Sequence, residues 1–573
     1  MTHRQILFVI FGLMAGMFLS ALDQTIVGTS MRTIADDLDG LSLQAWVTTA
    51  YLITSTIATP IYGKLSDIFG RRPLFIIAIV IFLGGSVAAG FADSMYQLAI
   101  FRALQGLGAG GLMALPLAIM GDILAPRERA KYQGYFLAVF GISSVIGPLI
   151  GGLLSGTPEI LFITGWRWVF LINAPIGLVA LAIVMRFLHI PHTRRKVRID
   201  WWGAATVVIA LVPLLLVAEK GRDWGWDSPL AFACYIVGAL GIAAFILSEK
   251  LMGDDALIPL KLFKSRTFSM TTVLGVLVGF GMFGAMMTIP LYLQLVEGAT
   301  PTESGFLMLP MILGLMISSI LSGQIIARTG TYSVFPKTGT ALMAAGFFWL
   351  TFLTADKPVI WIMVGMFLVG LGLGQLMQTL TIAAQNSVGP RDIGVATSSS
   401  TFFRQIGGTL GVAVLFSVLF TEIPTKIADA FSKLSIKDGI AAAMSDPTVL
   451  ADPKNAGIIE LYKNAASGGS VGNALDGDTS FLNGSDPRLA APFLEGFNNA
   501  TVSIYWVGLG VVLVAFVLSF FLKAAPLRAK SALQENSDNE AALAAQAAAA
   551  EMGAMVAPDT ASTPVVDGGA PKK

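Results

Sequence analysis

The sequence predicts an all-α polytopic membrane protein with fourteen transmembrane helices. Of its 573 residues, 55% are hydrophobic and only 13% are charged, whereas a soluble globule of this size needs far more charge to cover its surface. Apolar runs of about 18 or more residues recur along most of the chain, and each is long enough to cross a bilayer core of about 30 Å. An internal repeat further predicts that the helices form two related bundles.

The apolar runs place the spans along the chain. The first run is too long for a signal-peptide core and contains Asp23 instead of a small-residue cleavage site, so we expect a retained helix. Together the expected spans cover residues 6–30, 43–63, 73–92, 96–120, 131–155, 167–188, 201–219, 229–248, 267–294, 304–327, 335–354, 359–386, 394–421 and 499–523.

The distribution of basic residues predicts the orientation. An even number of spans puts both termini on one side of the membrane. If that side is the cytoplasm, most of the 37 Lys and Arg residues are cytoplasmic, as the positive-inside rule requires. The short outer loops then hold only Arg32, Arg167, Lys220, Arg222 and Lys357. We therefore expect a multi-pass protein of the cytoplasmic (inner) membrane with both termini in the cytoplasm.

The internal repeat relates two distant glycine-rich octets. Residues 106–113 read GLGAGGLM, and residues 370–377, which lie 264 positions later, read GLGLGQLM. Further matches follow in the same order: Pro126-Arg127-Glu128 with Pro390-Arg391-Asp392, Gly147 with Gly411 and, with four residues removed, Gly63 and Gly70 with Gly323 and Gly330. Matches in order favour gene duplication over chance.

The repeat and the polar stretches predict the domain organisation. We expect an N-terminal six-helix bundle at 1–190, a two-helix insertion with linkers at 191–266, and a C-terminal six-helix bundle at 267–523. The C-terminal bundle includes an extracytoplasmic loop, 422–499, whose apolar positions indicate short amphipathic helices. The remaining tail, 524–573, is rich in Ala and then in Pro, Gly and Thr, so we expect it to be disordered.

Five motifs carry a resemblance to a known family: Leu22-Asp23-Gln24-Thr25-Ile26-Val27 in span 1, Gly63-Lys64-Leu65-Ser66-Asp67-Ile68-Phe69-Gly70-Arg71-Arg72 after span 2, Arg102-Ala103-Leu104-Gln105-Gly106 in span 4, Gly147-Pro148-Leu149-Ile150-Gly151-Gly152 in span 5, and Trp166-Arg167-Trp168-Val169-Phe170-Leu171-Ile172-Asn173-Ala174-Pro175 at span 6. In this order they resemble the motifs of the major facilitator superfamily. The first and the last resemble those of its fourteen-span drug:proton antiporter family. The resemblance covers roughly residues 6–421 and the last span, with one departure: Ser143 stands where the antiporter motif usually has a leading glycine.

This resemblance implies a fold and a function. The fold is two six-helix bundles plus two inserted helices. The function is proton-coupled secondary antiport by alternating access, which exports small amphipathic or cationic drugs or metabolites, as in multidrug efflux and antibiotic resistance. It implies a proton gradient as the driving force and no cofactor.

Asp23 is the candidate proton-coupling residue. It is the only carboxylate deep inside any expected span, and burial penalises the charged form, so such a group can bind and release protons during transport. The resemblance also implies this role. The alternative is a hydrated aspartate near the helix end, in the outer vestibule.

Arg102 and Arg404 are the only strongly basic residues deep within the expected spans. Each must find a carboxylate, a carbonyl or water. Either could neutralise Asp23 and be released when the acid is protonated, which would convert proton binding into a conformational change. The family motif favours Arg102, and the alternative for both is a structural arginine bound to backbone carbonyls.

The loop after span 2 is the candidate conformational latch. Gly63 and Gly70 permit a tight turn and close helix approach. Asp67 can pair with Arg71 or cap a neighbouring helix, and Arg72 extends the basic end of the motif. A plain solvated loop is the alternative. The second-half copy has Ala327 where Asp67 stands, so any latch is asymmetric.

Two further groups of residues are candidates. In span 5, Gly141, Gly147, Gly151 and Gly152 around Pro148 predict close packing at the interface between the halves, or ordinary small-residue packing. For a substrate cavity, the candidate polar and aromatic residues are Trp46, Tyr51, Gln294, Gln375 and Gln378. Amides among Met and Phe suit chemically varied ligands, although they could equally be hydrogen-bonding contacts between helices.

The sequence offers no support for an enzyme. It contains no nucleotide-binding loop, no Ser-His-Asp order, one cysteine (Cys234) and three histidines outside the expected spans, so we expect no metal site. We expect a monomer whose partners are protons, a small amphipathic substrate and the lipid bilayer, with no nucleic acid. Two other functions stay open: export of lipids or cell-envelope precursors, and a membrane sensor or scaffold that does not transport.

Overall fold

The computed structural model describes residues 3–38, 44–188, 198–466, 482 and 484–523, with isolated residues between 526 and 546. Most of the tail 524–573 therefore lies outside the described residues. Within the described part, the only strands are the short antiparallel pair β1 (Glu159–Ile160) and β2 (Ile163–Thr164). Twelve of the described helices are long and apolar enough to cross a membrane. The predicted fold class, an all-α polytopic membrane protein, is confirmed.

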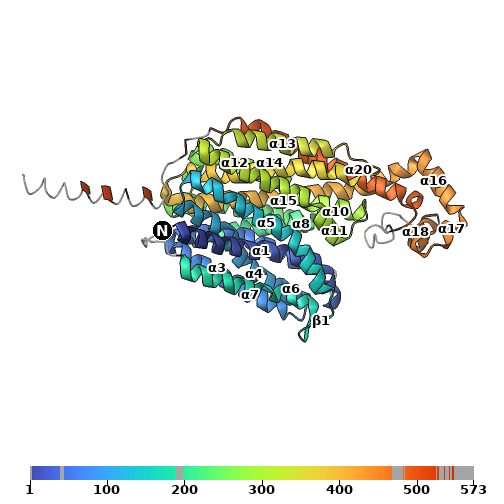
Figure 1. Ribbon diagram of the computed structural model, residues 1–573, viewed down its shortest axis with the longest axis horizontal. Helices are drawn as coiled ribbons and strands as arrows, with labels where there is room; N and C mark the ends of the chain where they lie inside the picture. The colour runs from blue at the N-terminus through green and yellow to red at the C-terminus, as the bar shows by residue number, and fades with distance from the viewer. Residues whose placement is uncertain are drawn as a thin grey trace, which may run out of the picture.

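The first half of the chain forms one bundle, drawn in blue to teal in Figure 1. Its helices are α1 (His3–Asp37), α2 (Gln44–Phe69), α3 (Arg71–Gly90), α4 (Met95–Ile123), α5 (Pro126–Ser155), α6 (Trp168–Leu171) and α7 (Asn173–Phe187), with the 3-10 turn η2 (Gly165–Arg167) before α6. Gly70 joins α2 to α3 with a φ of 99°, a conformation that disfavours residues with a side chain. Ser94 caps α4, because its hydroxyl accepts the backbone N–H of Gln97.

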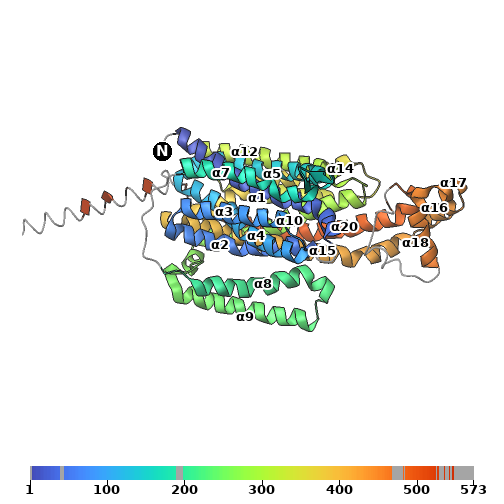
Figure 2. The same ribbon diagram turned by 90° about the horizontal axis from the view of Figure 1, so that it is seen from below.

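The inserted segment is a pair of helices, α8 (Trp201–Trp224) and α9 (Pro229–Met252), which lies beside the bundles in Figure 2. A close approach at Gly241 holds the two helices together, since a Cβ there would lie 2.6 Å from the backbone of Ala210. The turns η3 (Gly253–Asp255) and η4 (Leu260–Lys264) lead on to the second half.

The second half forms the other bundle. Its elements are α10 (Arg266–Leu295), α11 (Pro301–Leu307), α12 (Leu309–Thr329), α13 (Val334–Leu350), α14 (Val359–Asn386), η5 (Pro390–Asp392), α15 (Ile393–Ser432) and α20 (Pro487–Ser519). Gly330 ends α12 with a φ of 70°, and the repeat relates it to Gly70. The same backbone requirement therefore recurs at the same place in each half.

Two expected spans, 43–63 and 335–354, fall on α2 and α13, which are not among the twelve apolar helices. Helix α2 is rich in Ser and Thr, and α13 has only 17 residues. Both nevertheless pack within the bundles, α2 against α4 and α13 against α14. All fourteen expected spans thus correspond to helical segments of the structure.

The glycine octets of the repeat set the packing of both bundles. A Cβ at Gly106 would lie 2.5 Å from a backbone carbonyl oxygen of α2, and a Cβ at Gly370 would lie 2.0 Å from one of α12. Two positions further on, Gly108 and Gly372 bring α4 and α14 equally close to α3 and α13, at 2.5 Å each. Both octets therefore have the same structural role: they allow the backbones of neighbouring helices to come into contact.

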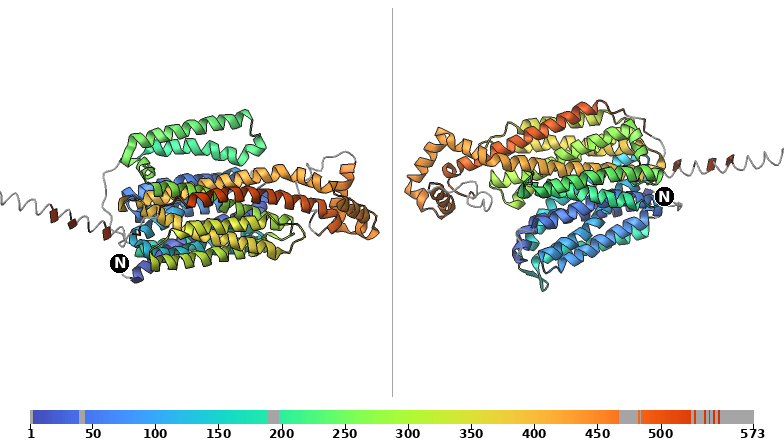
Figure 3. Two further views of the ribbon diagram at one scale, coloured as in Figure 1. Left: turned by 90° about the horizontal axis from the view of Figure 1, so that it is seen from above. Right: turned by 180° about the vertical axis from the view of Figure 1, so that it is seen from behind.

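The segment expected as an outer loop contains a helical lobe. It consists of α16 (Leu434–Met444), α17 (Pro447–Ala451), η6 (Pro453–Asn455) and α18 (Ala456–Ala466). Helices α15 and α20 run beyond their expected spans into this lobe, where Ile427, Phe493 and Phe497 share one apolar cluster. The lobe projects from one end of the molecule (Figures 1 and 3).

We call the end of the bundles where α1 begins the N-terminal face, and the end that carries the lobe the far face (Figure 1). The chain returns to the N-terminal face after α20, because the Thr267 hydroxyl at the start of α10 donates to the carbonyl of Lys523 at 2.9 Å.

Candidate functional site

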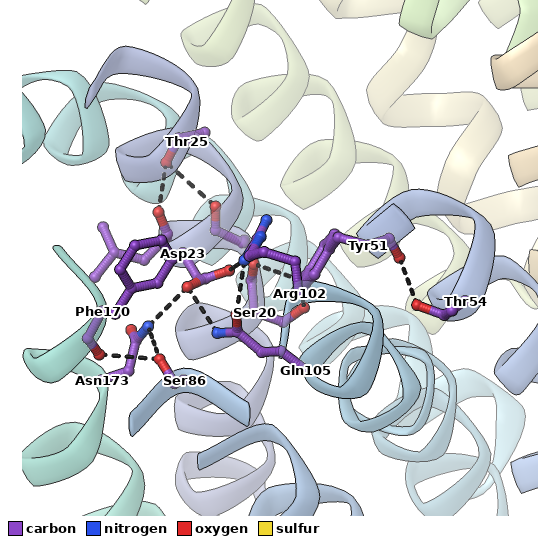
Figure 4. Close-up of polar contacts among 12 residues, drawn as sticks. Ser20, Asp23, Thr25, Tyr51, Thr54, Ser86, Arg102, Gln105, Phe170 and Asn173 are labelled. Carbon is purple, nitrogen blue, oxygen red and sulfur yellow. Dashed lines mark hydrogen bonds and ion pairs between the residues drawn. The ribbon is translucent and has the colours of Figure 1, made fainter. Parts of the chain in front are cut away.

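Asp23 lies in the interior of the N-terminal bundle, on α1 (Figure 4). Nη1 of Arg102 lies 2.5 Å from its Oδ2, and Nε2 of Gln105 and Nδ2 of Asn173 each lie 2.8 Å from its Oδ1. All four side chains have at most 1% of their surface exposed. In this structure Asp23 is therefore a buried, fully hydrogen-bonded carboxylate and not a hydrated group at a helix end.

Four helices hold this network together. Arg102 and Gln105 are three residues apart on α4, so they lie on one face, and Nη1 of Arg102 also donates to Oε1 of Gln105 at 2.8 Å. Asn173 opens α7 and donates to Ser86 of α3 at 2.9 Å. Sequence reasoning missed Gln105, Asn173 and Ser86, although both amides stand inside the motifs quoted above.

The arrangement links the charge of Asp23 to that of Arg102. Neutralising one member of a buried ion pair leaves the other uncompensated, which costs about 3–5 kcal/mol. In addition, Nε of Arg102 has no hydrogen-bond partner among the described residues. Proton uptake by Asp23 would therefore favour a conformation in which the guanidinium finds other partners or water.

Tyr51 of α2 lies on the other side of Arg102 from Asp23 (Figure 4). Its ring centroid is 4.0 Å from Cζ of Arg102, close enough for a cation–π interaction, and its hydroxyl lies 3.0 Å from Oγ of Ser20. Tyr51 and Ser20 also line the central cavity. The ion pair is thus separated from that cavity by one aromatic ring.

The central cavity has a volume of about 410 Å³ and is lined by residues of both halves. Its described lining includes six methionines, four aromatic residues and three glutamines. This size lies within the range of small-molecule sites, and Met-rich walls adapt to ligands of different shapes.

Arg404 of α15, the other arginine considered as a partner of Asp23, lines the cavity instead. It is 7% exposed, and it forms no ion pair with any residue that the structure describes. The structure thus gives the two arginines different environments: Arg102 is paired inside one bundle, and Arg404 faces the space between the bundles.

Of the five residues predicted to line a cavity, only Tyr51 is among the described residues that line the central cavity. Trp46 is 36% exposed. The three amides make hydrogen bonds between helices, which was the alternative interpretation: Gln294 with Ser304 at 3.2 Å, Gln375 with Thr338 at 2.6 Å, and Gln378 with Ser319 at 3.0 Å and Ser322 at 3.3 Å. The amides in the described lining are Gln24, Gln133 and Gln405.

The loop after α2 connects the two halves at the N-terminal face. Oδ1 of Asp67 lies 2.6 Å from Nη2 of Arg71, and its Oδ2 accepts the backbone N–H of Val395 in the first turn of α15 at 3.1 Å. Arg71 also lies 2.6 Å from Asp122 of α4. Asp67 therefore makes both contacts that the sequence offered as alternatives, an ion pair and a helix cap, and the cap crosses between the halves.

Burial raises the pKa of Asp67 to about 6 from 3.8, against the opposing effect of Arg71, while Asp122 adds to the rise. Beside this carboxylate, a Cβ at Gly63 would lie 1.9 Å from Oγ of Ser398 on α15, so α2 and α15 are in direct contact. Arg72 lies apart from this cluster and donates to the carbonyl of Met185 at 2.6 Å.

A second bridge at this face was not identified from the sequence. Nη1 of Arg129 on α5 donates to Oε1 of Gln385 on α14, and its Nη2 donates to the carbonyl of Gly121 at 2.6 Å. Nε2 of Gln385 donates to the carbonyl of Leu117 on α4 at 3.2 Å. Gly121 and Gln385, which both bind Arg129, stand at equivalent positions of the two halves, because the repeat spacing is 264. This equivalence was the only hint of the bridge in the sequence.

The span 5 glycines were expected to pack between the halves, and the structure divides them. Gly141 meets the other half, since a Cβ there would lie 2.4 Å from Cγ2 of Ile312 on α12, whereas Gly147 and Gly151 pack within the N-terminal half. A Cβ at Gly147 would lie 2.0 Å from Oγ1 of Thr25 on α1, and one at Gly151 would lie 2.9 Å from a carbonyl oxygen of the same helix. Pro148 instead meets the other half, 3.4 Å from a Cβ placed at Gly305. The carbonyl of Gly152 accepts the backbone N–H of Gly156, the residue that follows the end of α5. Gly147 and Gly151 thus hold α5 against the part of α1 that follows Asp23.

The described residues contain no group of three or more His, Cys, Asp or Glu placed to hold a metal ion.

Comparison with known proteins identifies the family. A model of the Major Facilitator Superfamily matches residues 13–412. The chain is 35% identical to "Multidrug transporter protein MdtP" of Bacillus subtilis over 542 residues, which are 93% of this chain and 96% of the relative. It is 36% identical to "Multidrug resistance protein 3" of the same organism over 443 residues, 77% of this chain and 85% of the relative.

Among solved structures, the proton:xylose symporter XylE has the same fold. The TM-score is 0.56 at 14% sequence identity, with 91% of this chain and 97% of that chain covered. At this identity the likeness concerns the fold alone. The resemblance found in the sequence motifs is confirmed: the chain belongs to the Major Facilitator Superfamily of membrane transporters.

Proposed function

We propose that the protein exports small amphipathic drugs or metabolites across the cytoplasmic membrane in exchange for protons. The names of its relatives, a multidrug transporter and a multidrug resistance protein, support this substrate class. The Met-rich cavity of about 410 Å³ between the bundles offers a site of suitable size.

The observation that carries the proposal is the buried pair of Asp23 and Arg102 beside that cavity. A carboxylate that is 0% exposed inside a membrane bundle is costly to charge, and here it has only one cationic partner at salt-bridge distance among the described residues. Protonation of Asp23 would release Arg102 and destabilise the present packing of α1 against α4. Loss of the proton would restore it.

The remaining sites then have roles in alternating access. The two six-helix bundles rock about the cavity, and the contacts at the N-terminal face, Asp67 with Val395 and Arg129 with Gln385, break and reform with each cycle. We assign this face to the cytoplasm because the basic residues of the sequence concentrate there. The transporter works as a monomer, with both termini in the cytoplasm and no cofactor.

The test uses purified protein in proteoliposomes with an imposed proton gradient and a panel of amphipathic dyes and drugs. We expect gradient-driven transport by the wild type to collapse with a protonophore, and Asp23→Asn to lower it at least tenfold. The matched control is Asp93→Asn, which removes an aspartate that is 83% exposed and should leave the rate unchanged.

Gradient-driven transport that survives in Asp23→Asn would contradict the proposal. A fluorescent lipid in the same vesicles tests the alternative of lipid export, because movement of the lipid without movement of any drug would favour that function.

A further inference from the structure

The central cavity has a one-sided charge. Arg404 is the sole charged residue among the described residues that line it, and none of these residues is an aspartate or a glutamate. Asp23 does not serve as a counter-ion for Arg404, because it is held by Arg102, Gln105 and Asn173 behind the ring of Tyr51. Any electrostatic attraction exerted by this cavity is therefore toward negative charge.

Arg404 is also a guanidinium that has no partner among the described residues. Its side chain is more than nine-tenths buried, and no hydrogen bond or ion pair joins it to the described residues. A cation in a membrane bundle is costly unless it is paired, and such residues mark ion or substrate pathways. Its backbone is fixed by close packing, since a Cβ at Gly279 of α10 would lie 2.2 Å from the Arg404 carbonyl oxygen.

The N-terminal half lines the cavity with uncharged side chains, in which aromatic and Met residues stand among Ser, Thr and Gln. The repeat spacing of 264 relates Arg404 on α15 to Phe140 on α5, and both residues line the cavity. Phe136, Met17 and Met113 extend this surface on the N-terminal half, while the other four methionines of the lining belong to the C-terminal half, as Arg404 does. The cavity thus offers a guanidinium on the C-terminal half, aromatic side chains mostly on the N-terminal half, and adaptable methionines on both.

We propose that the transported compounds are amphipathic anions, with a carboxylate or sulfonate that binds Arg404 and an apolar body that packs on the Met and Phe side chains. This rests on the proposed function for the act of transport, but the binding preference stands on the cavity alone. A guanidinium forms paired, charge-assisted hydrogen bonds with such groups. A lipophilic cation finds no acidic partner in the described lining.

The experiment compares two probes that share a ring system and differ in charge: 8-anilinonaphthalene-1-sulfonate and its neutral analogue N-phenyl-1-naphthylamine. Binding is measured on the full chain in lipid nanodiscs, with empty nanodiscs subtracted, and ethidium serves as the cation. We expect the wild type to bind the sulfonate most tightly. Arg404→Met should weaken sulfonate binding about tenfold to hundredfold and change binding of the neutral analogue less than twofold.

Two further variants guard against misfolding. Arg404→Lys keeps a positive charge and should recover part of the sulfonate affinity. Arg186→Met removes an exposed arginine outside the cavity lining and should leave all three probes unaffected. Thermal unfolding of each variant is measured in parallel.

The outcomes separate the two proposals. The anion site is overturned if Arg404→Met weakens the binding of all three probes equally. It is also overturned if the wild type binds ethidium more tightly than the sulfonate. If sulfonate binding depends on Arg404 while transport depends neither on the proton gradient nor on Asp23, the proposed antiport is wrong and the anion site stands.

Discussion

The two halves of the molecule pack alike but carry different side chains at equivalent buried positions. In the N-terminal half, Arg102 and Gln105 of α4 bind Asp23. In the C-terminal half, 264 residues later, Met366 and Val369 of α14 stand at these positions, and both are fully buried in an apolar cluster. The octet glycines meanwhile make the same backbone contacts in both halves. Backbone packing is thus common to the two bundles, whereas the buried ion pair at these positions belongs to the N-terminal one.

The cavity shows a complementary difference. There the N-terminal half contributes Phe140 and the C-terminal half contributes Arg404 at the equivalent position. The charged pair of the N-terminal half is therefore enclosed within its bundle, whereas the charged residue of the C-terminal half, Arg404, lines the cavity. This separation is consistent with a proton site in one half and a substrate-charge site in the other.

The largest expected effect comes from making α4 resemble α14 with Arg102→Met. Asp23 would then be buried without its cation, so we expect the free energy of unfolding to fall by about 3–5 kcal/mol and gradient-driven transport to be lost. Unfolding of the protein in detergent measures the first effect, and proteoliposome transport measures the second.

The double variant Asp23→Asn/Arg102→Met is the informative control for that experiment. We expect it to regain most of the stability, because neither charge is left alone, but none of the proton coupling. Full stability of the single Arg102→Met variant would show that the ion pair is not what distinguishes the two bundles.

The next effect concerns the contact between α2 and α15. In Gly63→Leu, the new side chain must displace Ser398, so we expect the N-terminal face to open at a cost to the present conformation of about 1–3 kcal/mol. A cysteine at Ser398, in a Cys234→Ala background, should then react faster with a maleimide. Gly84→Ala is the control, because a Cβ at Gly84 meets nothing within 4 Å.

A smaller effect follows from the pKa of Asp67, whose copy in the second half is Ala327. The pKa is raised to about 6 from 3.8 where Asp67 is buried by the contacts at the N-terminal face, beside Arg71, Asp122 and Lys64. A raised acid pKa means that the closed face binds the proton more tightly than an open face does. Closure is therefore favoured below pH 6, and this advantage is lost as the pH rises through 6.

Labelling of the cysteine at position 398, normalised to unfolded protein at each pH, measures this effect. We expect labelling about tenfold slower at pH 5 than above pH 7. The variant Asp67→Asn should show no such dependence, and an unchanged profile in that variant would assign the titration to another group.

The smallest effect tests the buried amide of the C-terminal half. Gln378 accepts hydroxyl hydrogen bonds from Ser319 and Ser322, and the repeat places Ala114 at the equivalent position of the N-terminal half. Since hydrogen bonds between membrane helices average about 0.6 kcal/mol, we expect Gln378→Met to lower the free energy of unfolding by that order. Proton coupling should not change, and a loss of coupling would give this half a proton-linked role.

The fold was predictable because long apolar runs and matching glycine spacings follow directly from the membrane and from duplication. The helices that contain the two spans bordering the lobe are longer than those spans, since α15 continues to Ser432 and α20 starts at Pro487. These extensions are amphipathic and leave no continuous apolar signal. Within the site, Asp23 and Arg102 were identifiable because charge is costly in a span.

Gln105 and Asn173 carry no charge and gave no such signal. Whether Arg102 or Arg404 pairs with Asp23 also depends on how each helix is rotated within its bundle, which the sequence did not specify. The structure resolves this for its present conformation by pairing Asp23 with Arg102.

Helix α15 runs unbroken for 40 residues, or about 60 Å at 1.5 Å per residue, roughly twice the thickness of a bilayer core. Because α15 and α20 share an apolar cluster with the lobe, we expect the lobe to move together with the C-terminal bundle. A swing of the bundle by about 10° would carry the lobe through an arc of about 10 Å over this length. If the bundle rotates as proposed, a small movement at the cavity would become a larger displacement of the lobe, and a fluorophore attached to the lobe would report it.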